Sequence, residues 1–126
     1  MSPRSLVIVA TVVSGLVAHA PVHALPTTKP DLLNLIQFLE DNRTGTATLR
    51  QLSRHRDPDI RGFALLALGR NEVKASRASI EAGLRDSVAE VRRVAAFALG
   101  QLGDPGAVPA LLAARPPPSP RPPSPR

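Results

Sequence analysis

The sequence contains no cysteine, tryptophan or tyrosine, and its only aromatic side chains are three phenylalanines. Without cysteine the chain cannot form a disulfide framework, a thiol nucleophile, a thiolate metal site or a lipid-modified cysteine. Aromatic side chains also supply buried area in compact cores and form the platforms on which single-stranded nucleic acids stack. Packing must therefore come from alanine, leucine and valine, which suits closely approaching helices.

Acidic residues are in the minority, with 10 Asp and Glu against 16 Lys and Arg, a net charge of +6. Such a balance permits an acidic protein partner, nucleic acid or an anionic membrane surface. Part of the excess lies near the two ends, at Arg4, Arg121 and Arg126. Charge alone therefore does not choose among these partners, although the missing aromatic platforms argue against nucleic acid.

Residues 1–24 have the pattern of a secretory signal peptide. Arg4 precedes an apolar run over 6–17, and residues 22–24 place small or apolar side chains at positions −3 and −1 of a cleavage site. The run is shorter than the roughly 20 apolar residues of a membrane span. We expect a mature protein that begins at Leu25, is periplasmic or extracellular, and has no stable membrane insertion.

An internal repeat runs through the rest of the chain. Residues 59–69 and 90–100 match with an offset of 31 positions, and both read as an acid, a β-branched residue, an arginine, an apolar stripe and a closing glycine. The apolar positions follow the spacing of one helix face. In the two copies these positions are Ile60, Phe63, Ala64, Ala67 and Leu68, then Val91, Val94, Ala95, Ala98 and Leu99.

Local signals mark where these helices begin and end. Asp57 followed by Pro58 predicts an N-cap with proline in the first turn. Ser87 and Glu90, three positions apart, have the spacing of a capping box. Left-handed C-caps are expected at three glycines: Gly69, Gly100 and Gly103.

The repeat predicts an all-α solenoid over residues 25–115, because no helix pair alone could bury its apolar face. Residues 116–126 contain only proline, serine and arginine, and we expect them to form a disordered tail. Three helix pairs are predicted: 30–42 with 46–55, 58–69 with 76–85, and 88–102 with 107–115.

The third copy resembles a short HEAT repeat of the phycobilisome-lyase-like (E-Z) type, and the resemblance covers roughly 30–114. It is carried by Val91-Arg92, Ala95-Ala96, Ala98-Leu99-Gly100, Leu102-Gly103-Asp104-Pro105 and Ala107-Val108-Pro109-Ala110-Leu111. The middle copy departs from it, with Asn71-Glu72-Val73-Lys74 at the inter-helix turn. The resemblance implies an armadillo-like protein-binding module whose second helices line the inner, concave surface.

Charged residues off the apolar stripe of the second helices are the candidate partner-binding positions: Arg50, Arg54, Glu81 and Arg85. They predict either a groove for an acidic partner or an ordinary solvated helix face. Arg61 and Arg92 recur in register, which favours stacking contacts between repeats over a ladder of ligand sites. With Gly69 and Gly100 they are the candidate structural positions of the repeat.

No catalytic or cofactor site is expected. After residue 24 the sequence has a single histidine, His55, so neither a histidine metal cluster nor a supported triad can be assembled. Phycobilin lyases are longer, and no residue here marks a bilin pocket. Deoxyhypusine hydroxylase, another HEAT-like relative, holds iron with His-Glu pairs, and this sequence contains none.

The resulting functional hypothesis is a non-catalytic scaffold or adaptor that binds a protein outside the cytoplasm. Two alternatives remain open. The chain could be a truncated fragment of a larger exported HEAT-repeat protein, because no polar capping repeat follows the third copy. It could instead bind nucleic acid or an anionic membrane surface electrostatically, with steep salt dependence.

Overall fold

The computed structural model describes residues 25–121 and 123, so the expected signal peptide and the last residues of the tail lie outside it. The chain divides into two units, Met1–Leu32 and Leu33–Arg126. Residues 25–28 lead into helix α2 (Lys29–Asp41), which begins in the first unit and has most of its residues in the second. The hydroxyl of Thr28 donates to the carboxylate of Asp31 at 2.7 Å, and the Asp31 N–H donates back to that hydroxyl oxygen at 3.4 Å.

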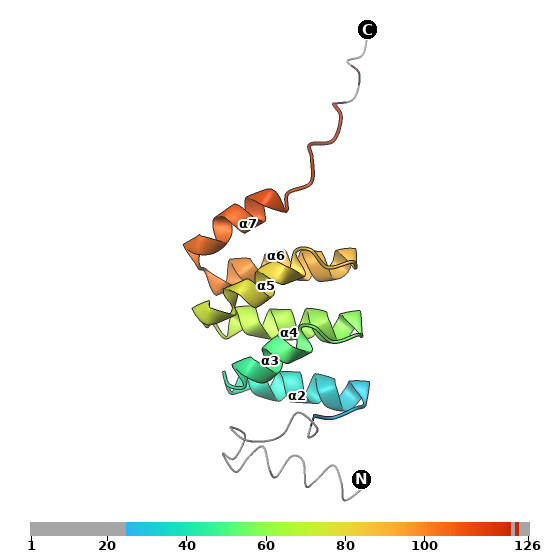
Figure 1. Cartoon of the computed structure of the whole chain (residues 1–126), viewed down its shortest axis with the longest axis vertical. Coiled ribbons are helices and arrows are strands. Elements are labelled where there is room, and N and C mark those ends of the chain that lie inside the picture. Colours follow the sequence, from blue (N-terminus) through green and yellow to red (C-terminus); the bar gives the residue numbers. More distant parts are fainter. Residues whose placement is uncertain (1–24, 122, 124–126) are drawn as a thin grey trace, which may run out of the picture. The chain divides into compact units, whose positions relative to one another are not determined.

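All regular secondary structure in the described residues of the second unit is helical, and this confirms the all-α prediction (Figure 1). Two 3-10 turns, η3 (Lys74–Ser76) and η4 (Pro105–Ala107), lead into α5 and α7. After the end of α2, the helices are α3 (Thr46–Leu52), α4 (Pro58–Arg70), α5 (Arg77–Gly83), α6 (Ala89–Leu102) and α7 (Val108–Ala113).

The second helices are shorter than predicted. α3 ends at Leu52 and α5 at Gly83, so Arg54 and Arg85 lie in turns and not on helices. Their backbone N–H groups donate to carbonyls three residues earlier, Gln51 and Ala82, at 3.1 Å each. This tightening of the last turn is a common way to satisfy the free carbonyls of a helix end.

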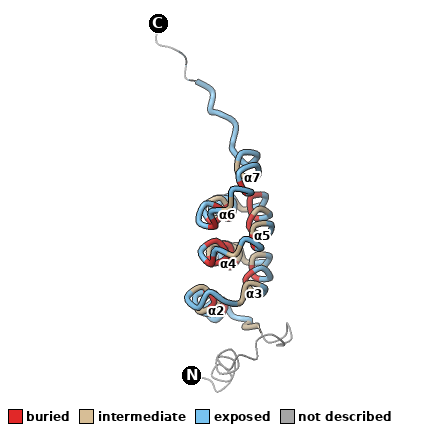
Figure 2. The backbone as a smooth tube through the Cα atoms, turned by 90° about the vertical axis from the view of Figure 1, so that its left-hand side faces the viewer, coloured by how far each residue is buried: buried red, intermediate tan, exposed pale blue. Residues whose placement is uncertain are grey.

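The core lies between two layers, with α4 and α6 on one side and α3, α5 and α7 on the other (Figure 2). The stripe alanines are fully buried, as predicted: Ala64, Ala67, Ala95 and Ala98. Phe63 is an exception, because 51% of it is exposed and Leu65 is buried in its place. The buried face of α4 is therefore rotated by part of a turn from the predicted stripe.

Gly69 and Gly100 are not left-handed caps, contrary to the prediction, because both lie inside helices. A Cβ atom at Gly69 would lie 2.5 Å from the carbonyl oxygen of Ala98, so the glycine allows α4 and α6 to approach closely. The predicted left-handed cap does occur at Gly103, with φ 64°. After α4 the positive φ, 56°, belongs to Glu72 in the turn that departs from the resemblance.

Of the two helices α4 and α6, only α4 has a side-chain cap. Asp57 caps α4 as predicted, by accepting from the N–H of Asp59 at 2.9 Å. The predicted Ser87–Glu90 capping box does not form at α6. Asp86 instead accepts from the N–H of Val88 at 2.9 Å, while Glu90 pairs with Arg93 at 2.6 Å.

Candidate functional site

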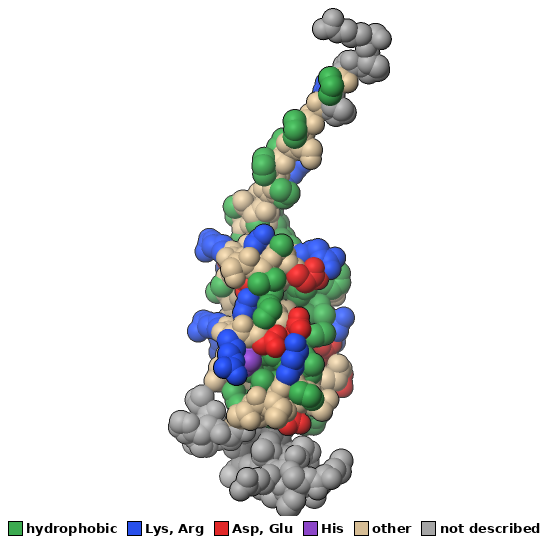
Figure 3. Space-filling view, turned by 90° about the vertical axis from the view of Figure 1, so that its right-hand side faces the viewer, with side chains coloured by type: hydrophobic (Ala, Val, Ile, Leu, Met, Phe, Trp, Pro, Cys, Tyr) green, Lys and Arg blue, Asp and Glu red, His purple; other side chains and the backbone are tan. Residues whose placement is uncertain are grey.

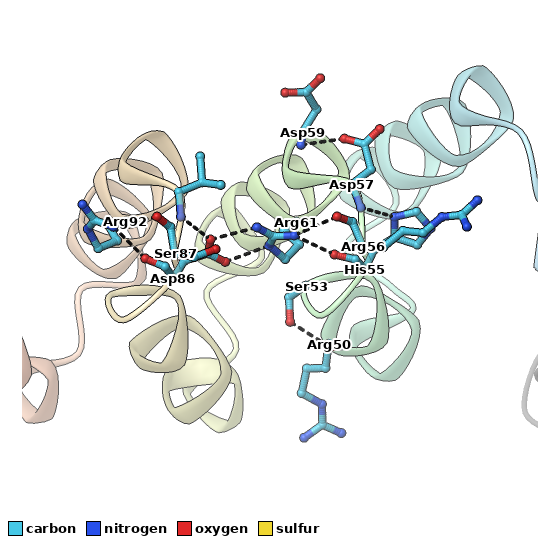
Figure 4. A network of polar contacts seen from close by, with 11 residues as sticks. Arg50, Ser53, His55, Arg56, Asp57, Asp59, Arg61, Asp86, Ser87 and Arg92 are labelled. Carbon is cyan, nitrogen blue, oxygen red and sulfur yellow. Dashed lines mark hydrogen bonds and ion pairs between the residues drawn. The ribbon is translucent and has the colours of Figure 1, made fainter.

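Arg61, in the first turn of α4, joins two successive repeats. Its Nη1 donates to the carbonyl oxygens of His55 at 3.0 Å and Arg56 at 3.1 Å. Its Nε and Nη2 donate to the two carboxylate oxygens of Asp86 at 2.7 and 2.8 Å (Figure 4). The side chains of Arg61 and Asp86 are only 15% and 13% exposed. One guanidinium thus links the turn before α4 to the loop before α6.

The charges of this pair stabilise each other. The hydrogen bond from Arg61 holds the pKa of Asp86 below its ordinary value, and the N–H of Val88 lowers it further against the opposing effect of burial. The same hydrogen bond raises the pKa of Arg61. Because Asp86 also accepts from the N–H of Val88, the residue before α6, the ion pair couples the loop that leads into one repeat's first helix to the preceding repeat.

Arg92, which is 31 positions after Arg61, repeats only half of this arrangement. Its Nη1 donates to the carbonyl oxygens of Asp86 at 2.7 Å and Ser87 at 3.2 Å (Figure 4). The position 31 residues after Asp86 is Pro117. Among the described residues, no acidic side chain pairs with Arg92. The two arginines therefore share an anchor, while Arg61 alone holds a carboxylate.

Two other ion pairs also cross between repeats. Arg70 pairs with Glu40 at 2.6 Å. Arg77 pairs with Asp104 at 3.0 Å and with Glu81 at 3.4 Å. The N–H of Gly106 is the main cause of the lowered pKa of Asp104, with Arg77 adding to it. Glu81 is half-buried and engaged by Arg77, so it differs from the other candidate partner-binding residues.

Arg50, Arg54 and Arg85 are all exposed, and within the part of the chain that the structure describes none forms a salt bridge. Arg50 points away from the Arg61 network (Figure 4). Arg54 and Arg85 occupy equivalent turns after α3 and α5. In the space-filling view of Figure 3, basic side chains lie along the left margin of the molecule, and the acidic side chains lie nearer the centre and the right. We call Arg50, Arg54 and Arg85 the basic row.

The one histidine beyond residue 24 has a structural contact. The N–H of Asp57 donates to Nδ1 of His55 at 3.1 Å, within the turn that precedes α4. Over residues 25–121 and 123, no group of three or more His, Asp or Glu side chains could hold a metal ion. In the same range, no helix is long and apolar enough to cross a membrane.

Four acidic residues lie near Arg61 and Arg92 in the sequence (Asp57, Asp59, Asp86 and Glu90), and the structure selects Asp86 as the partner of Arg61. Asp86 lies 31 positions after His55, and the two side chains make the same local contact. Each accepts from the N–H two residues later, Asp57 for His55 and Val88 for Asp86. Sequence reasoning missed that a carboxylate at this repeat position also receives the guanidinium of the preceding repeat.

The family model for HEAT repeats matches residues 45–121, which is more than half of the chain. This range contains α3 to α7, together with the Arg61–Asp86 link and the basic row. No curated protein and no solved structure matched the chain. The matched range and the helix pairs that repeat every 31 residues agree, and the chain therefore belongs to the HEAT-repeat family.

Proposed function

We propose that this protein is a non-catalytic scaffold that binds an acidic segment of a partner protein through the basic row. The observation that carries the proposal is the equivalence of Arg54 and Arg85. Both are exposed, both follow a second helix by the same turn, and neither has an acidic partner in the described residues. HEAT repeats commonly serve as protein-interaction scaffolds, which supports this class of function.

The chemistry of arginine favours a carboxylate-bearing partner. A guanidinium presents several donors in a rigid plane, and it can hold a carboxylate through two parallel hydrogen bonds. The basic row would place such groups at successive repeats. Exposed charges add little to stability but strongly affect encounter rate and partner choice. Few aromatic side chains accompany the row, which favours a protein over single-stranded nucleic acid.

Two finer assignments belong to the same proposal. The charged start and apolar run of residues 1–24 support export, and the Leu-Gly-Asp-Pro turn of the third pair supports the phycobilisome-lyase-like subtype of the repeat. Export predicts that the protein isolated from its native cells begins at Leu25. Mass spectrometry of the intact protein measures this directly, and a membrane-associated chain that still carries Met1 would contradict it.

The binding proposal is tested by reversing the charge of the row. The variant Arg54→Glu/Arg85→Glu is compared with wild type and with Arg115→Glu/Arg121→Glu, which changes the net charge equally at exposed tail positions. Each protein is used to capture partners from an extracytoplasmic extract, and bound proteins are quantified by mass spectrometry. We expect acidic partners to be lost only with the first variant. Unchanged circular dichroism shows that the loss is not unfolding.

Identical partners for all three proteins would remove the basic row from the function. Retention measured against heparin over a range of salt concentrations separates the electrostatic alternative. A generic polyanion binder loses affinity steeply and uniformly as salt rises. The Arg115→Glu/Arg121→Glu variant has the same net charge as the Arg54→Glu/Arg85→Glu variant. The proposal predicts that only the Arg115→Glu/Arg121→Glu variant still captures the acidic protein partner.

A further inference from the structure

The second and third helix pairs differ most at the positions where one repeat would meet the next. Gly69 is buried, and a Cβ there would lie 2.5 Å from the carbonyl oxygen of Ala98 and 2.8 Å from its Cα. Gly100, 31 positions later, is exposed, and a Cβ there would meet nothing within 4 Å. The place where a neighbouring helix crosses α4 is therefore open on α6.

The second helices show the same contrast. Ile80 of α5 is fully buried, whereas its equivalent in α7, Leu111, is only half-buried. Arg77 of α5 reaches the next repeat at Asp104, and its equivalent in α7 is Val108. Val108 is 50% exposed and Leu112 is 66% exposed. α7 therefore presents apolar side chains where α5 presents an ion pair.

Arg92 supplies a charge beside this open surface. Two carbonyl oxygens fix its Nη1, as two fix that of Arg61. A fixed guanidinium loses little conformational freedom when it binds, so Arg92 is prepared to receive a carboxylate as Arg61 receives Asp86. The ion pair at Arg61 shows the geometry that such a carboxylate would adopt.

We propose that these residues form a docking surface for a HEAT-type helix pair that lies outside residues 1–126. The surface, which we call the terminal face, consists of Arg92, Gly100, Val108, Leu111 and Leu112. The partner places a small side chain of its first helix against Gly100, as Ala98 packs against Gly69. It also carries an Asp or Glu in the loop before that helix, and this carboxylate binds Arg92.

Charge selects this occupant over the alternatives. Residues 105–126 contain no Asp or Glu side chain, so they cannot supply the carboxylate. A second copy that docked through the same face would bring two Arg92 side chains together, and like charges disfavour that contact. The position 31 residues before His55 is Ala24, so the first helix pair of a second copy offers no acid there. The proposal is independent of the basic row.

A synthetic peptide with the sequence of residues 86–115 serves as the probe, because it carries both Asp86 and Ala98. It contains the change Gly100→Leu so that one probe cannot dock on another. The probe is titrated into the isotope-labelled full chain, and amide chemical shifts are followed by NMR. We expect shifts at Arg92, Gly100 and Leu111 and none at Arg50. Helix content should rise on mixing as the probe folds on the surface.

Two variants of the full chain and one of the probe sharpen the test. Gly100→Leu fills the open groove and Leu112→Glu charges the apolar margin, and each should abolish the shifts. An Asp86→Asn probe should bind about tenfold more weakly, the loss expected for a hydrogen bond to a charged group. The Arg54→Glu/Arg85→Glu chain should bind the probe like wild type, which separates this face from the basic row.

Three results would overturn the proposal. The first is the absence of shifts at millimolar probe, and the second is equal binding by the Gly100→Leu chain. The third is a dimer of the full chain, seen by light scattering, that Gly100→Leu dissociates, because the occupant would then be a second copy. Circular dichroism melting of each variant alone confirms that the acceptor remains folded.

Discussion

Arg61 and Asp86 form two hydrogen bonds between successive repeats, whereas each of the other described ion pairs between repeats forms one. Asp86 binds the guanidinium of one repeat and accepts from the N–H of Val88, the residue before the first helix of the next. Losing it removes an ion pair and a hydrogen bond that orders this loop. The conservative change Asp86→Asn retains an oxygen that can accept from Val88 but removes the charge, and it therefore isolates the ion pair.

The pair predicts a specific dependence of stability on pH. The pKa of Asp86 in the folded protein is below its ordinary value of 3.8. As pH falls below that value, the unfolded chain takes up the proton first, so the stabilisation present at neutral pH is lost on acidification. Asp86→Asn should lower the free energy of unfolding by about 2 kcal/mol at pH 7.

Urea unfolding of wild type and Asp86→Asn measures this difference at several pH values. The difference should shrink as pH falls from about 5 through the lowered pKa of Asp86, and it should approach zero once this carboxylate is protonated in the folded and the unfolded wild-type chain. Glu90 provides a comparison, because its pKa is also lowered, chiefly by Arg93, within a single helix. A difference that stays constant over the whole range would show that the charge of Asp86 does not stabilise the fold.

At the scale of the helix, the two equivalent glycines are a matched pair for testing the stack. Gly69→Ala places a methyl group against the backbone of Ala98, where neither helix can yield without separating. Overpacking of this kind costs about 1–3 kcal/mol. Gly100→Ala meets open space and should be neutral or stabilising by about 0.5–1 kcal/mol, because alanine favours a helix interior.

Thermal and urea unfolding measure the stability of the two variants. The change in the free energy of unfolding should differ in sign between Gly69→Ala and Gly100→Ala, although the substitution and the repeat position are the same. Similar destabilisation by both would mean that α6 has a neighbour at Gly100 in the isolated protein. Similar tolerance of both would mean that α4 and α6 do not approach closely at Gly69.

The helices were predictable from the sequence because their apolar spacing and their 31-residue period agree. The residues at which the helices begin and end were harder to predict. Glycine near the end of a helix pattern predicts a left-handed cap. Gly69 instead allows α6 to pack closely against α4, and Gly100 leaves open space on α6. Local sequence contains no information on which helix will cross there. Ser87 and Glu90 have the spacing of a capping box, but α6 has no side-chain cap and Glu90 pairs with Arg93 instead.

At the scale of the Leu33–Arg126 unit, the candidate sites separate into predictable and unpredictable parts. The exposure of the basic row could be anticipated, since Arg54 and Arg85 lie off the apolar stripe. The pairing of Glu81 with Arg77 was missed, although the two residues lie four positions apart on the predicted helix 76–85. The terminal face was also missed, since it is defined by contacts that the equivalent residues make one repeat earlier.

The central claim is that neighbouring helix pairs stabilise each other through the contacts that join α4 to α6, namely the Arg61–Asp86 ion pair and the close approach at Gly69. Stability in such an array is approximately the sum of the repeats and their interfaces. Inserting a second copy of residues 85–115 after Arg115 places an aspartate 31 positions beyond Asp86, where it can reach Arg92. The copied α6 also places a small side chain, the copy of Ala98, over Gly100. The melting temperature of this extended chain, compared with wild type, is the most direct measurement. The account predicts a single transition raised by about 5 °C or more, whereas an unchanged midpoint or a separate transition for the added pair would contradict it.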